Sequence, residues 1–381
     1  MKSVTVVGAS LAGVAAARAL RDQGFDGRIT MIGDEVHLPY DRPPLSKSFL
    51  LGDESALPLD IDGLDVEWRL GCAATGLSGT TVSTASGDIG ADAVVIATGA
   101  AACRLPGTVG IDGIHVLRSL DDARALRSSL SSGVRVTVVG AGFIGSEVAS
   151  TAVGMGASVT VVEASETPLA RVFGSELGSL IAGWHRNAGA ALLTGVSVAG
   201  FVVQAGRVRA VELADGSMIE SDVVVLGVGS TPNVGWLDGS GLDIHGGVLT
   251  DHRGITSNPA VVAVGDCAAV RDAAGVIRRD EHWTSAATRP AVAVEALLTG
   301  GSKGFTGLPY VWSDQYAARI QFAGHHGPDC IADIVEGDPT TGPFVALYRH
   351  NDRPVAVLAV SSPRSFGKWR RQVVDTSTLM T

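Results

Sequence analysis

Two glycine-rich segments of this 381-residue chain have the spacing that binds the diphosphate of a dinucleotide. Residues 140–145, Gly-Ala-Gly-Phe-Ile-Gly, match Gly-x-Gly-x-x-Gly in full, and residues 8–13, Gly-Ala-Ser-Leu-Ala-Gly, have serine in the middle. The first glycine permits a tight bend, a small middle residue lets the backbone approach a pyrophosphate, and the last glycine lets helix and strand pack closely. One match also fits an ordinary strand-to-helix turn, whereas two favour dinucleotide binding. We assign to these sites Gly8, Ser10, Gly13, Gly140, Gly142, Ile144 and Gly145.

An acidic residue follows each glycine-rich segment at the distance where a carboxylate accepts hydrogen bonds from an adenosine ribose. Asp34, with Glu35 beside it, follows the first segment, and Glu163 follows the second. The carboxylate of Glu163 would repel the 2′-phosphate of NADP, and residues 164–167 contain no arginine to bind that phosphate, so NADH is favoured. A strand-end cap or a solvated carboxylate is the alternative role for both acids.

A third acidic residue, Asp266, follows the apolar residues 261–265. It is expected at the carboxyl end of a strand, where open α/β sheets bind ligands, and there it could accept a hydrogen bond from a ribityl hydroxyl. The alternative is that Asp266 caps a helix beginning at Cys267.

The segment Pro-Tyr-Asp-Arg-Pro-Pro-Leu-Ser-Lys, residues 39–47, cannot form a regular helix because of its prolines. We expect a rigid functional loop that brings Lys47 close to a flavin, where a cation stabilises negative charge on the reduced ring. Glu147, just inside the helix after the second glycine turn, is the expected ion-pair partner of Lys47. The alternative is an exposed lysine and a solvated glutamate on the surface.

These residues are positioned by an internal repeat. Residues 5–9, Thr-Val-Val-Gly-Ala, recur as residues 137–141, at an offset of 132. Each copy reads as a buried strand, a glycine turn, an Ala-rich helix and a second strand, which is the βαβ pattern of a parallel sheet. A later apolar strand ending in glycine closes each copy, at residues 93–99 and 223–229, and a third such strand, residues 261–266, returns the chain to the first domain.

The predicted fold class is therefore α/β, with two doubly wound, Rossmann-like dinucleotide-binding domains and a small C-terminal α+β domain. That last domain is expected from strand-like stretches that begin near Leu308 and are separated by Gly, Asp and Pro turns. The stretches are residues 310–312, 319–322, 344–348 and 354–360.

Composition indicates a globular protein with several domains: 46% of residues are hydrophobic, 18% are charged, and mean hydropathy is +0.28. The net charge of −10 argues against nucleic acid or an anionic membrane as a partner. We expect a cytoplasmic protein without a signal peptide or membrane span. The four cysteines, without any Cys-x-x-Cys, indicate no metal site and no dithiol pair, and we expect buried free thiols. They are Cys72, Cys103, Cys267 and Cys330.

In these features taken together, the chain resembles the FAD-dependent NADH:ferredoxin reductases of bacterial Rieske dioxygenase and P450 systems. This family lies within the glutathione-reductase-like flavoproteins, together with rubredoxin reductases and apoptosis-inducing factor. The resemblance covers nearly the whole chain and rests on residues 8–13, 38–47, 97–100, 117–123, 140–147, 264–268, 281–284 and 312–316.

The resemblance implies FAD in the first site, NADH in the second, hydride transfer between them, and single electrons leaving to a 2Fe–2S ferredoxin. It places the Lys47–Glu147 pair beside the flavin as the catalytic pair, with Glu163 on the NADH ribose. Trp283 and Trp312 lie near the ring, although the residues alone favour core packing for both. The implied FAD contacts are Ala12, Asp34, Arg42, Lys47, Ala74, Arg118, Asp266 and Trp283. We add Thr98, Gly99 and Gly229, at the ends of the closing strands, to the cofactor-binding set.

The domain division predicted on this basis is 1–106 for the first part of the FAD-binding domain, 107–232 for the NADH-binding domain, 233–305 for the second part of the FAD-binding domain, and 306–381 for a C-terminal interface domain. The chain departs from the family at three places. Residues 52–71 lack most of a helix, Pro290 should kink or restart a helix, and residues 101–103 lack a usual arginine and proline.

Ferredoxins are generally acidic, so docking needs a local positive face on this acidic chain. The candidate cations, for each of which a solvated surface role is the alternative, are Arg278, Arg279, Arg289, Arg319, Arg364, Lys368, Arg370 and Arg371. Rubredoxin or oxygen are alternative electron acceptors, and a redox-responsive protein that binds FAD and NAD with little turnover is an alternative function. Either a monomer or a homodimer is compatible with the sequence.

Overall fold

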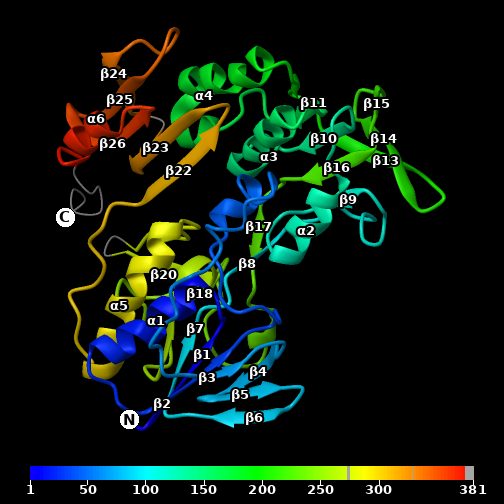
Figure 1. Ribbon diagram of the computed structural model, residues 1–381. Helices are drawn as coiled ribbons and strands as arrows, with labels where there is room; N and C mark the ends of the chain where they lie inside the picture. Colours follow the sequence, from blue (N-terminus) through cyan, green and yellow to red (C-terminus); the bar gives the residue numbers. More distant parts are fainter. Residues whose placement is uncertain (273–274, 328, 374–381) are drawn as a thin grey trace.

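The computed structural model describes residues 1–272, 275–327 and 329–373. Two parallel sheets of similar topology and a C-terminal antiparallel sheet form three parts of the molecule (Figure 1). The predicted fold class is confirmed.

The first parallel sheet has the strand order β19-β7-β1-β2-β3. The helix α1 (Leu11–Asp22) follows β1 and packs against α5 (Trp283–Thr299), which returns from the far end of the chain. The strand β19 pairs in parallel with β7, so the chain does return to the first sheet after the second unit. The strands are β1 (Ser3–Val7), β2 (Arg28–Ile32), β3 (Glu67–Arg69), β7 (Ala93–Ile96) and β19 (Val261–Ala263).

The second parallel sheet repeats this topology in the order β12-β11-β10-β16-β9. The edge strand next to the closing strand is β19 in the first sheet and β9 in the second. In the sequence β19 comes after the other strands of its sheet, whereas β9 comes before them. The elements are β9 (Ile114–His115), α2 (Leu120–Ser129), β10 (Arg135–Val139), α3 (Phe143–Gly154), β11 (Ser158–Glu163), α4 (Ala170–Asn187), β12 (Ala191–Thr194) and β16 (Val223–Leu226).

Smaller sheets accompany both units, and the antiparallel ribbon of β8 (Ala100–Ala102) and β17 (Ser230–Pro232) runs between them. This ribbon lies near the predicted junctions 106/107 and 232/233, whose positions remain predictions. The smaller sheets are β4 (Ala74–Ser78) with β5 (Thr81–Thr84) and β6 (Gly87–Gly90); β13 (Val198–Gln204) with β14 (Arg207–Leu213) and β15 (Met218–Glu220); and β18 (Val248–Thr250) with β20 (Ala268–Arg271) and β21 (Ile277–Arg278).

The C-terminal sheet is antiparallel, in the order β22-β23-β26-β25-β24, and is followed by α6 (Pro363–Arg370). One face packs on α4, where Phe173, Leu177 and Ile181 meet its buried side chains. The edge strand β24 was not predicted, because its residues, Ile-Ala-Asp-Ile-Val-Glu-Gly, are mostly exposed and do not alternate between polar and apolar. The strands are β22 (Tyr310–Gln315), β23 (Ala318–Gly324), β24 (Ile331–Gly337), β25 (Phe344–His350) and β26 (Arg353–Val360).

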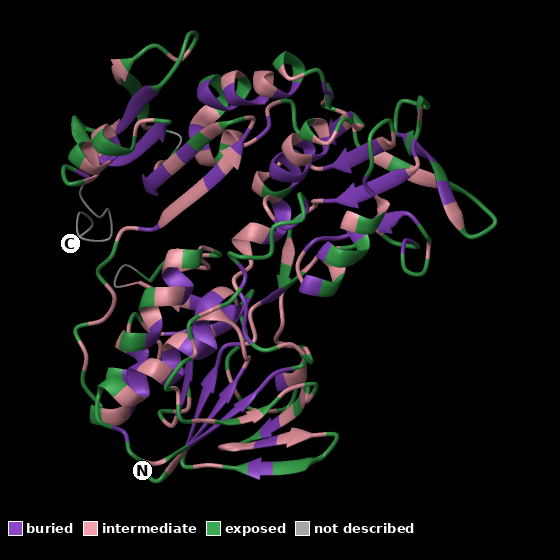
Figure 2. Ribbon diagram, in the orientation of Figure 1, coloured by how far each residue is buried: buried purple, intermediate pink, exposed green. Residues whose placement is uncertain are grey.

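Burial explains why the parallel strands are continuous apolar runs. In Figure 2 the central strands of both parallel sheets are largely buried, since helices or further strands cover them. Val6 in β1 and Val138 in β10 have no exposed surface, and burying a valine side chain contributes about 1.5 kcal/mol or more. The sheets therefore hold the glycine turns that follow them on rigid supports.

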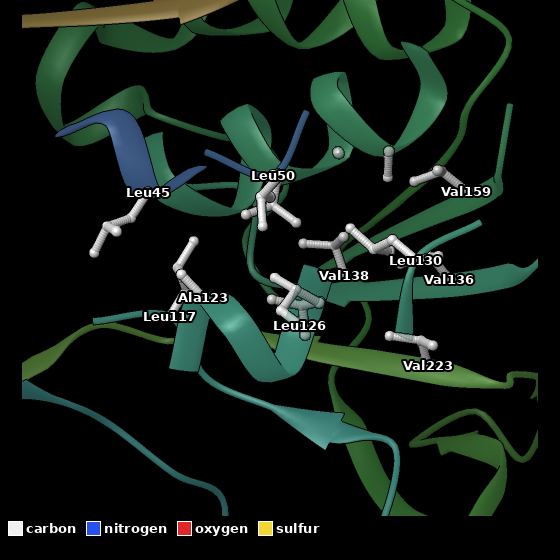
Figure 3. Close-up of a cluster of buried hydrophobic side chains, with 14 of the residues drawn as sticks. Leu45, Leu50, Leu117, Ala123, Leu126, Leu130, Val136, Val138, Val159 and Val223 are labelled. Atoms are coloured by element: carbon white, nitrogen blue, oxygen red, sulfur yellow. The ribbon is translucent and has the colours of Figure 1, made fainter. Parts of the chain in front are cut away.

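The proline-rich loop packs its apolar side chains into the core of the second unit rather than the first. Pro43–Ser46 forms a 3₁₀ turn, after which Phe49 and Leu50 are fully buried. Figure 3 shows Leu45 and Leu50 beside side chains of α2 and β10, in one buried cluster. Between this turn and β3 there is no helix or strand, as expected for residues 52–71.

The prediction that Pro290 restarts a helix is wrong, while a kink at this residue stays a prediction. The helix α5 runs from Trp283 to Thr299 without interruption, so Pro290 does not restart it. A proline removes a single N–H from the hydrogen-bond ladder. Burial of Pro290 and the packing of α5 on α1 offset that loss.

Candidate cofactor and electron-transfer site

Both ends of the first glycine turn are glycine because the protein itself leaves no room for a side chain. Gly8 has φ +117°, and a Cβ there would lie 2.1 Å from the carbonyl oxygen of Ala97. A Cβ on Gly13 would lie 1.9 Å from the carbonyl oxygen of Gly8. Ser10 precedes α1 and makes no capping bond, while Arg42 Nε lies 3.4 Å from its Oγ. The turn thus brings the N-terminus of α1 close to the carboxyl end of β7.

The second turn separates glycines required by the fold from one that the fold does not require. A Cβ on Gly140 would lie 2.3 Å from Gly227 O, and one on Gly145 would lie 2.0 Å from Gly140 O. A Cβ on Gly142 would have no protein atom within 4 Å. Gly142 is the N-cap of the 12-residue α3, and Ile144 beside it is exposed. Open space at a helix N-terminus fits a diphosphate, which backbone N–H groups and the helix dipole bind.

Glu163 is held at the end of β11 by two backbone donors. Its Oε2 accepts from the N–H of Ala141 and its Oε1 from that of Ser165, each at 2.8 Å. The carboxylate is thereby fixed at the second glycine turn, where the sequence placed it. The structure agrees with a ribose-binding role, which remains a prediction.

At the first turn, Glu35 makes the contacts within the protein, whereas Asp34 is exposed. Glu35 accepts a hydrogen bond from Tyr40 at 2.5 Å and one from Arg42 at 2.7 Å. This orients Arg42 toward the turn and leaves Asp34 facing solvent, where a bound ribose can reach it. From the sequence, Glu35 was considered only as the residue beside Asp34, and its role in orienting Arg42 was missed.

Asp266 lies in a network at the carboxyl ends of β7 and β19. Its Oδ2 is 2.6 Å from Arg118, whose Nε donates to Ala100 O and whose carbonyl accepts from Arg42. Asp266 lies inside the short 3₁₀ turn Gly265–Cys267, whose N-cap is Val264, and no helix begins at Cys267. The alternative that Asp266 is an N-cap is therefore wrong.

The remaining predicted FAD contacts differ in how close they lie to this network. A Cβ on Gly265 would lie 2.9 Å from that of Ala12, so this part of α1 closely faces the Asp266 turn. Thr98 Oγ1 donates to Asn233 O, and Gly99 has φ +65°. Ala74, at the start of β4, has no contact with the network among the described hydrogen bonds.

The turn after the second closing strand is open. Gly229 has φ +101°, and a Cβ there would meet no protein atom within 4 Å. Its carbonyl accepts a hydrogen bond from Cys103 N at 2.9 Å, which ties it to the ribbon between the two units.

Lys47 and Glu147 form an ion pair, with Nζ 2.7 Å from Oε2. Glu147 is only 2% exposed, and Lys47 Nζ also donates to Pro43 O at 3.1 Å. The pair joins the loop of the first unit to α3 of the second. The alternative of an exposed lysine and a solvated glutamate is therefore wrong.

Aromatic side chains lie next to this loop. Trp283, at the start of α5, donates from Nε1 to Asp41 at 2.7 Å and meets Trp312 edge to face at 5.8 Å. Burial is the largest influence on Asp41 and raises the pKa of its carboxyl. Tyr310 stacks on Trp312, with ring centroids 5.9 Å apart. Trp283 is 38% exposed, so it is not core filling.

Most of the candidate docking cations are already paired with acids. Arg278 pairs with Asp272, Arg279 with Glu281, Arg289 with Asp280, Arg319 with Asp314 and Lys368 with Glu336. Arg370 instead lies over the ring of Tyr310, 5.1 Å from its centroid. Arg370 of α6 thus places a positive charge beside Tyr310.

His185, buried in α4, links α3 to the C-terminal sheet and leads to a pH prediction. Its Nδ1 is 2.6 Å from the Tyr316 hydroxyl, its Nε2 is 3.3 Å from Ser146 Oγ, and burial lowers its pKa from 6.5 to about 4. Below pH 6.5 the His185 side chain is protonated in the unfolded chain but stays neutral in the folded chain. The free energy of unfolding therefore falls as pH drops toward 4. We expect His185 to account for a loss of up to about 3 kcal/mol over this range.

Denaturant unfolding at several pH values between 4 and 7 tests this expectation. The His185→Gln variant should lose correspondingly less stability across the same range. Equal slopes for the two proteins would contradict it.

Some classes of site are absent from the described part of the chain. Residues 1–272, 275–327 and 329–373 contain no group of three or more His, Cys, Asp or Glu that could hold a metal ion. None of the helices described is long and apolar enough to cross a membrane. All four cysteines are free, but only Cys267 is buried, so the expectation of buried thiols is wrong for the other three.

Comparisons with known proteins decide the family. The pyridine nucleotide-disulphide oxidoreductase family matches residues 2–300, and the reductase C-terminal family matches residues 310–379. The chain belongs to the pyridine nucleotide-disulphide oxidoreductase family. Similarity to the ferredoxin reductases is strong over nearly its whole length. The biphenyl dioxygenase system ferredoxin–NAD(+) reductase component of Paraburkholderia xenovorans is 35% identical, over 97% of this chain and 93% of that protein.

Putidaredoxin reductase of Pseudomonas putida is 32% identical, over 98% of this chain and 92% of that protein. The solved covalent putidaredoxin reductase–putidaredoxin complex has a TM-score of 0.92 at 30% identity, covering 97% of this chain and 92% of that one. The ferredoxin reductase for the CYP199A2 system of Rhodopseudomonas palustris has a TM-score of 0.91 at 32% identity, covering 98% and 96%. The predicted family and the prediction of an oxidoreductase are confirmed.

Proposed function

We propose that this protein is an NADH-dependent ferredoxin reductase. Its FAD would accept hydride from NADH and release single electrons to a 2Fe–2S ferredoxin that feeds an oxygenase or P450. The observation that carries the proposal is the pair of glycine turns at matching positions of two parallel sheets, with the Lys47–Glu147 pair between the units. The names of the relatives support NAD as the nucleotide and a ferredoxin as the acceptor.

The residues of the first site fit FAD. The N-terminus of α1 and Ser10 would bind the diphosphate, Asp34 the ribose, and Asp266 a ribityl hydroxyl. Arg42 and Arg118 supply positive charge, and each is already oriented by an acid, Glu35 and Asp266 respectively. We propose that the whole predicted FAD set, including Ala12, Ala74, Thr98, Gly99 and Trp283, surrounds this cofactor.

The residues of the second site fit NADH. The open N-terminus of α3 at Gly142 would bind the diphosphate, with Ile144 and Gly229 beside it. Glu163 would accept from the ribose hydroxyls and repel a 2′-phosphate. Since NADH is a cytoplasmic reductant, we also propose a cytoplasmic location.

The chemistry of this chain is positioning and electrostatics rather than nucleophilic attack. Lys47 provides a cation whose direction is set by Glu147, and the rings of Trp283 and Trp312 lie edge to face beside this loop. The four cysteines are free and widely spaced in the sequence, which agrees with direct electron release and not with a dithiol relay. We place the acceptor next to Trp312 and Arg370, where an acidic ferredoxin meets positive charge.

Anaerobic stopped-flow spectroscopy tests the proposal. NADH should bleach the flavin rapidly, NADPH should do so poorly, and the bleached protein should reduce a small acidic 2Fe–2S ferredoxin at a rate that falls with ionic strength. Absence of bleaching, or failure to reduce any such ferredoxin, would overturn the proposal. Rubredoxin or oxygen reduction alone would indicate one of the alternative acceptors. Slow bleaching with an NADH-dependent change in oligomer size would indicate a redox-responsive protein.

A further inference from the structure

Glu147 is part of a buried chain of hydrogen bonds that extends beyond Lys47. Ser313 donates from Oγ to Glu147 Oε1 at 2.7 Å, and Gln315 Nε2 donates to Ser313 Oγ at 3.0 Å. On the other side, Oε2 accepts from Ser46 at 2.5 Å and from Lys47 at 2.7 Å. Apart from Lys47, each residue in this series of hydrogen bonds is 2% exposed or less.

The chain of hydrogen bonds connects all three parts of the molecule at one carboxylate. Ser46 and Lys47 come from the loop of the first unit, Glu147 from α3 of the second, and Ser313 from β22 of the C-terminal sheet. Helix α3 packs directly against both the 3₁₀ turn of that loop and β22. In Figure 1 the loop, α3 and β22 meet where the three parts join. A change in the hydrogen bond from Ser313 therefore alters the interaction of the same carboxylate with Lys47 and Ser46.

The donors on Glu147 compete for one negative charge. Each donor neutralises part of the charge of the shared carboxylate and so weakens its attraction for the other donors. In a buried site this electrostatic effect is stronger than in water. Oε1 has the Ser313 hydroxyl and, at 3.3 Å, the N–H of Asp314. Without that hydroxyl the carboxylate would draw more strongly on Lys47, the only cation that contacts it among the described residues.

We propose that Ser313 is a positioning residue for the flavin. Through Glu147 it sets how much of the positive charge of Lys47 reaches the cofactor. The inference rests on the proposed function, because it needs a flavin next to Lys47. Ser313 belongs to the same strand as Tyr310 and Trp312, so the C-terminal sheet both faces the electron acceptor and tunes the flavin.

The test is a dye-equilibrated reductive titration of the FAD-loaded protein, with neither NADH nor ferredoxin present. Ser313→Ala should shift the equilibrium about tenfold toward oxidised flavin, which is about 30 mV for a two-electron couple. Ser46→Ala removes another donor from the same carboxylate and should shift it in the same direction. Ser313→Thr keeps the hydroxyl and should restore the wild-type value.

The matched control is Ser150→Ala. Ser150 Oγ accepts from Tyr316 N at 2.7 Å, so this variant breaks a bond between α3 and the same hairpin without touching Glu147. It should titrate like the wild type. A wild-type titration for both Ser313→Ala and Ser46→Ala overturns the inference, as does an equal shift in Ser150→Ala. Failure of the wild-type protein to bind FAD would instead refute the proposed function.

Discussion

Replacing Gly142 by valine is expected to weaken NADH binding about 100-fold or more while leaving the protein folded. A factor of 100 is about 2.7 kcal/mol of binding free energy. Gly142 has φ −73° and ψ −175°, which any residue adopts, and a Cβ would meet no protein atom within 4 Å. The glycine is therefore not required by packing or by backbone conformation. A branched side chain at this N-cap would hold a diphosphate away from the N–H groups of α3.

Titration calorimetry with NADH measures the loss, and thermal unfolding checks the fold. Gly142→Ser is the matched variant and should lose much less affinity, since Ser10 occupies the same position of the first turn. Gly145→Ala should behave in the opposite way. Its Cβ would lie 2.0 Å from Gly140 O, so it should lower the unfolding temperature. Wild-type affinity in Gly142→Val would mean that NADH does not bind at this turn.

The two parallel sheets were predictable because the sequence that forms the first strand and glycine turn occurs twice. Residues 5–9 and 137–141 repeat strand and turn together, and the strand after each glycine turn has the same parallel register with its neighbour. A parallel sheet with right-handed crossovers leaves few other topologies. The return of residues 261–263 to the first sheet followed from the same pattern. The edge strand β24, which is mostly exposed and has no counterpart in a repeat, carried no comparable signal.

The destination of the proline-rich loop was not predictable from its sequence. Prolines exclude a helix, but nothing local indicates that Leu45 and Leu50 pack with Leu126 and Val138 in the second unit. That packing is what brings Lys47 to Glu147. A long-range contact of this kind is decided by which apolar surface is left uncovered after both sheets form.

The candidate site was predictable where a residue type is rare for its surroundings, as with a glycine at a strand end or an acid after an apolar strand. Ser313 has no such signal, because serine is common and its role depends entirely on the carboxylate it meets. Pro290 shows the converse, since a strong local rule was outweighed by the packing of α5 on α1.

The Lys47→Met variant should lose both stability and rate. Glu147 is 2% exposed, and removing its cation leaves a buried charge, which costs about 3 kcal/mol of unfolding free energy. Flavin reduction by NADH should slow about 100-fold, the usual effect of deleting one preorganised electrostatic contact. Denaturant unfolding and anaerobic stopped-flow measure the two effects separately.

The double variant Lys47→Met with Glu147→Gln separates the structural role of the pair from its electrostatic role. A glutamine amide keeps hydrogen-bonding capacity toward Ser46 and Ser313 but carries no charge, so most of the lost stability should return. The rate should not return, because the cation at position 47 is still missing. If both stability and rate recover, Lys47 only neutralises Glu147. If the rate stays low in a stable protein, the cation itself acts on the flavin, and the buried carboxylate serves to aim it.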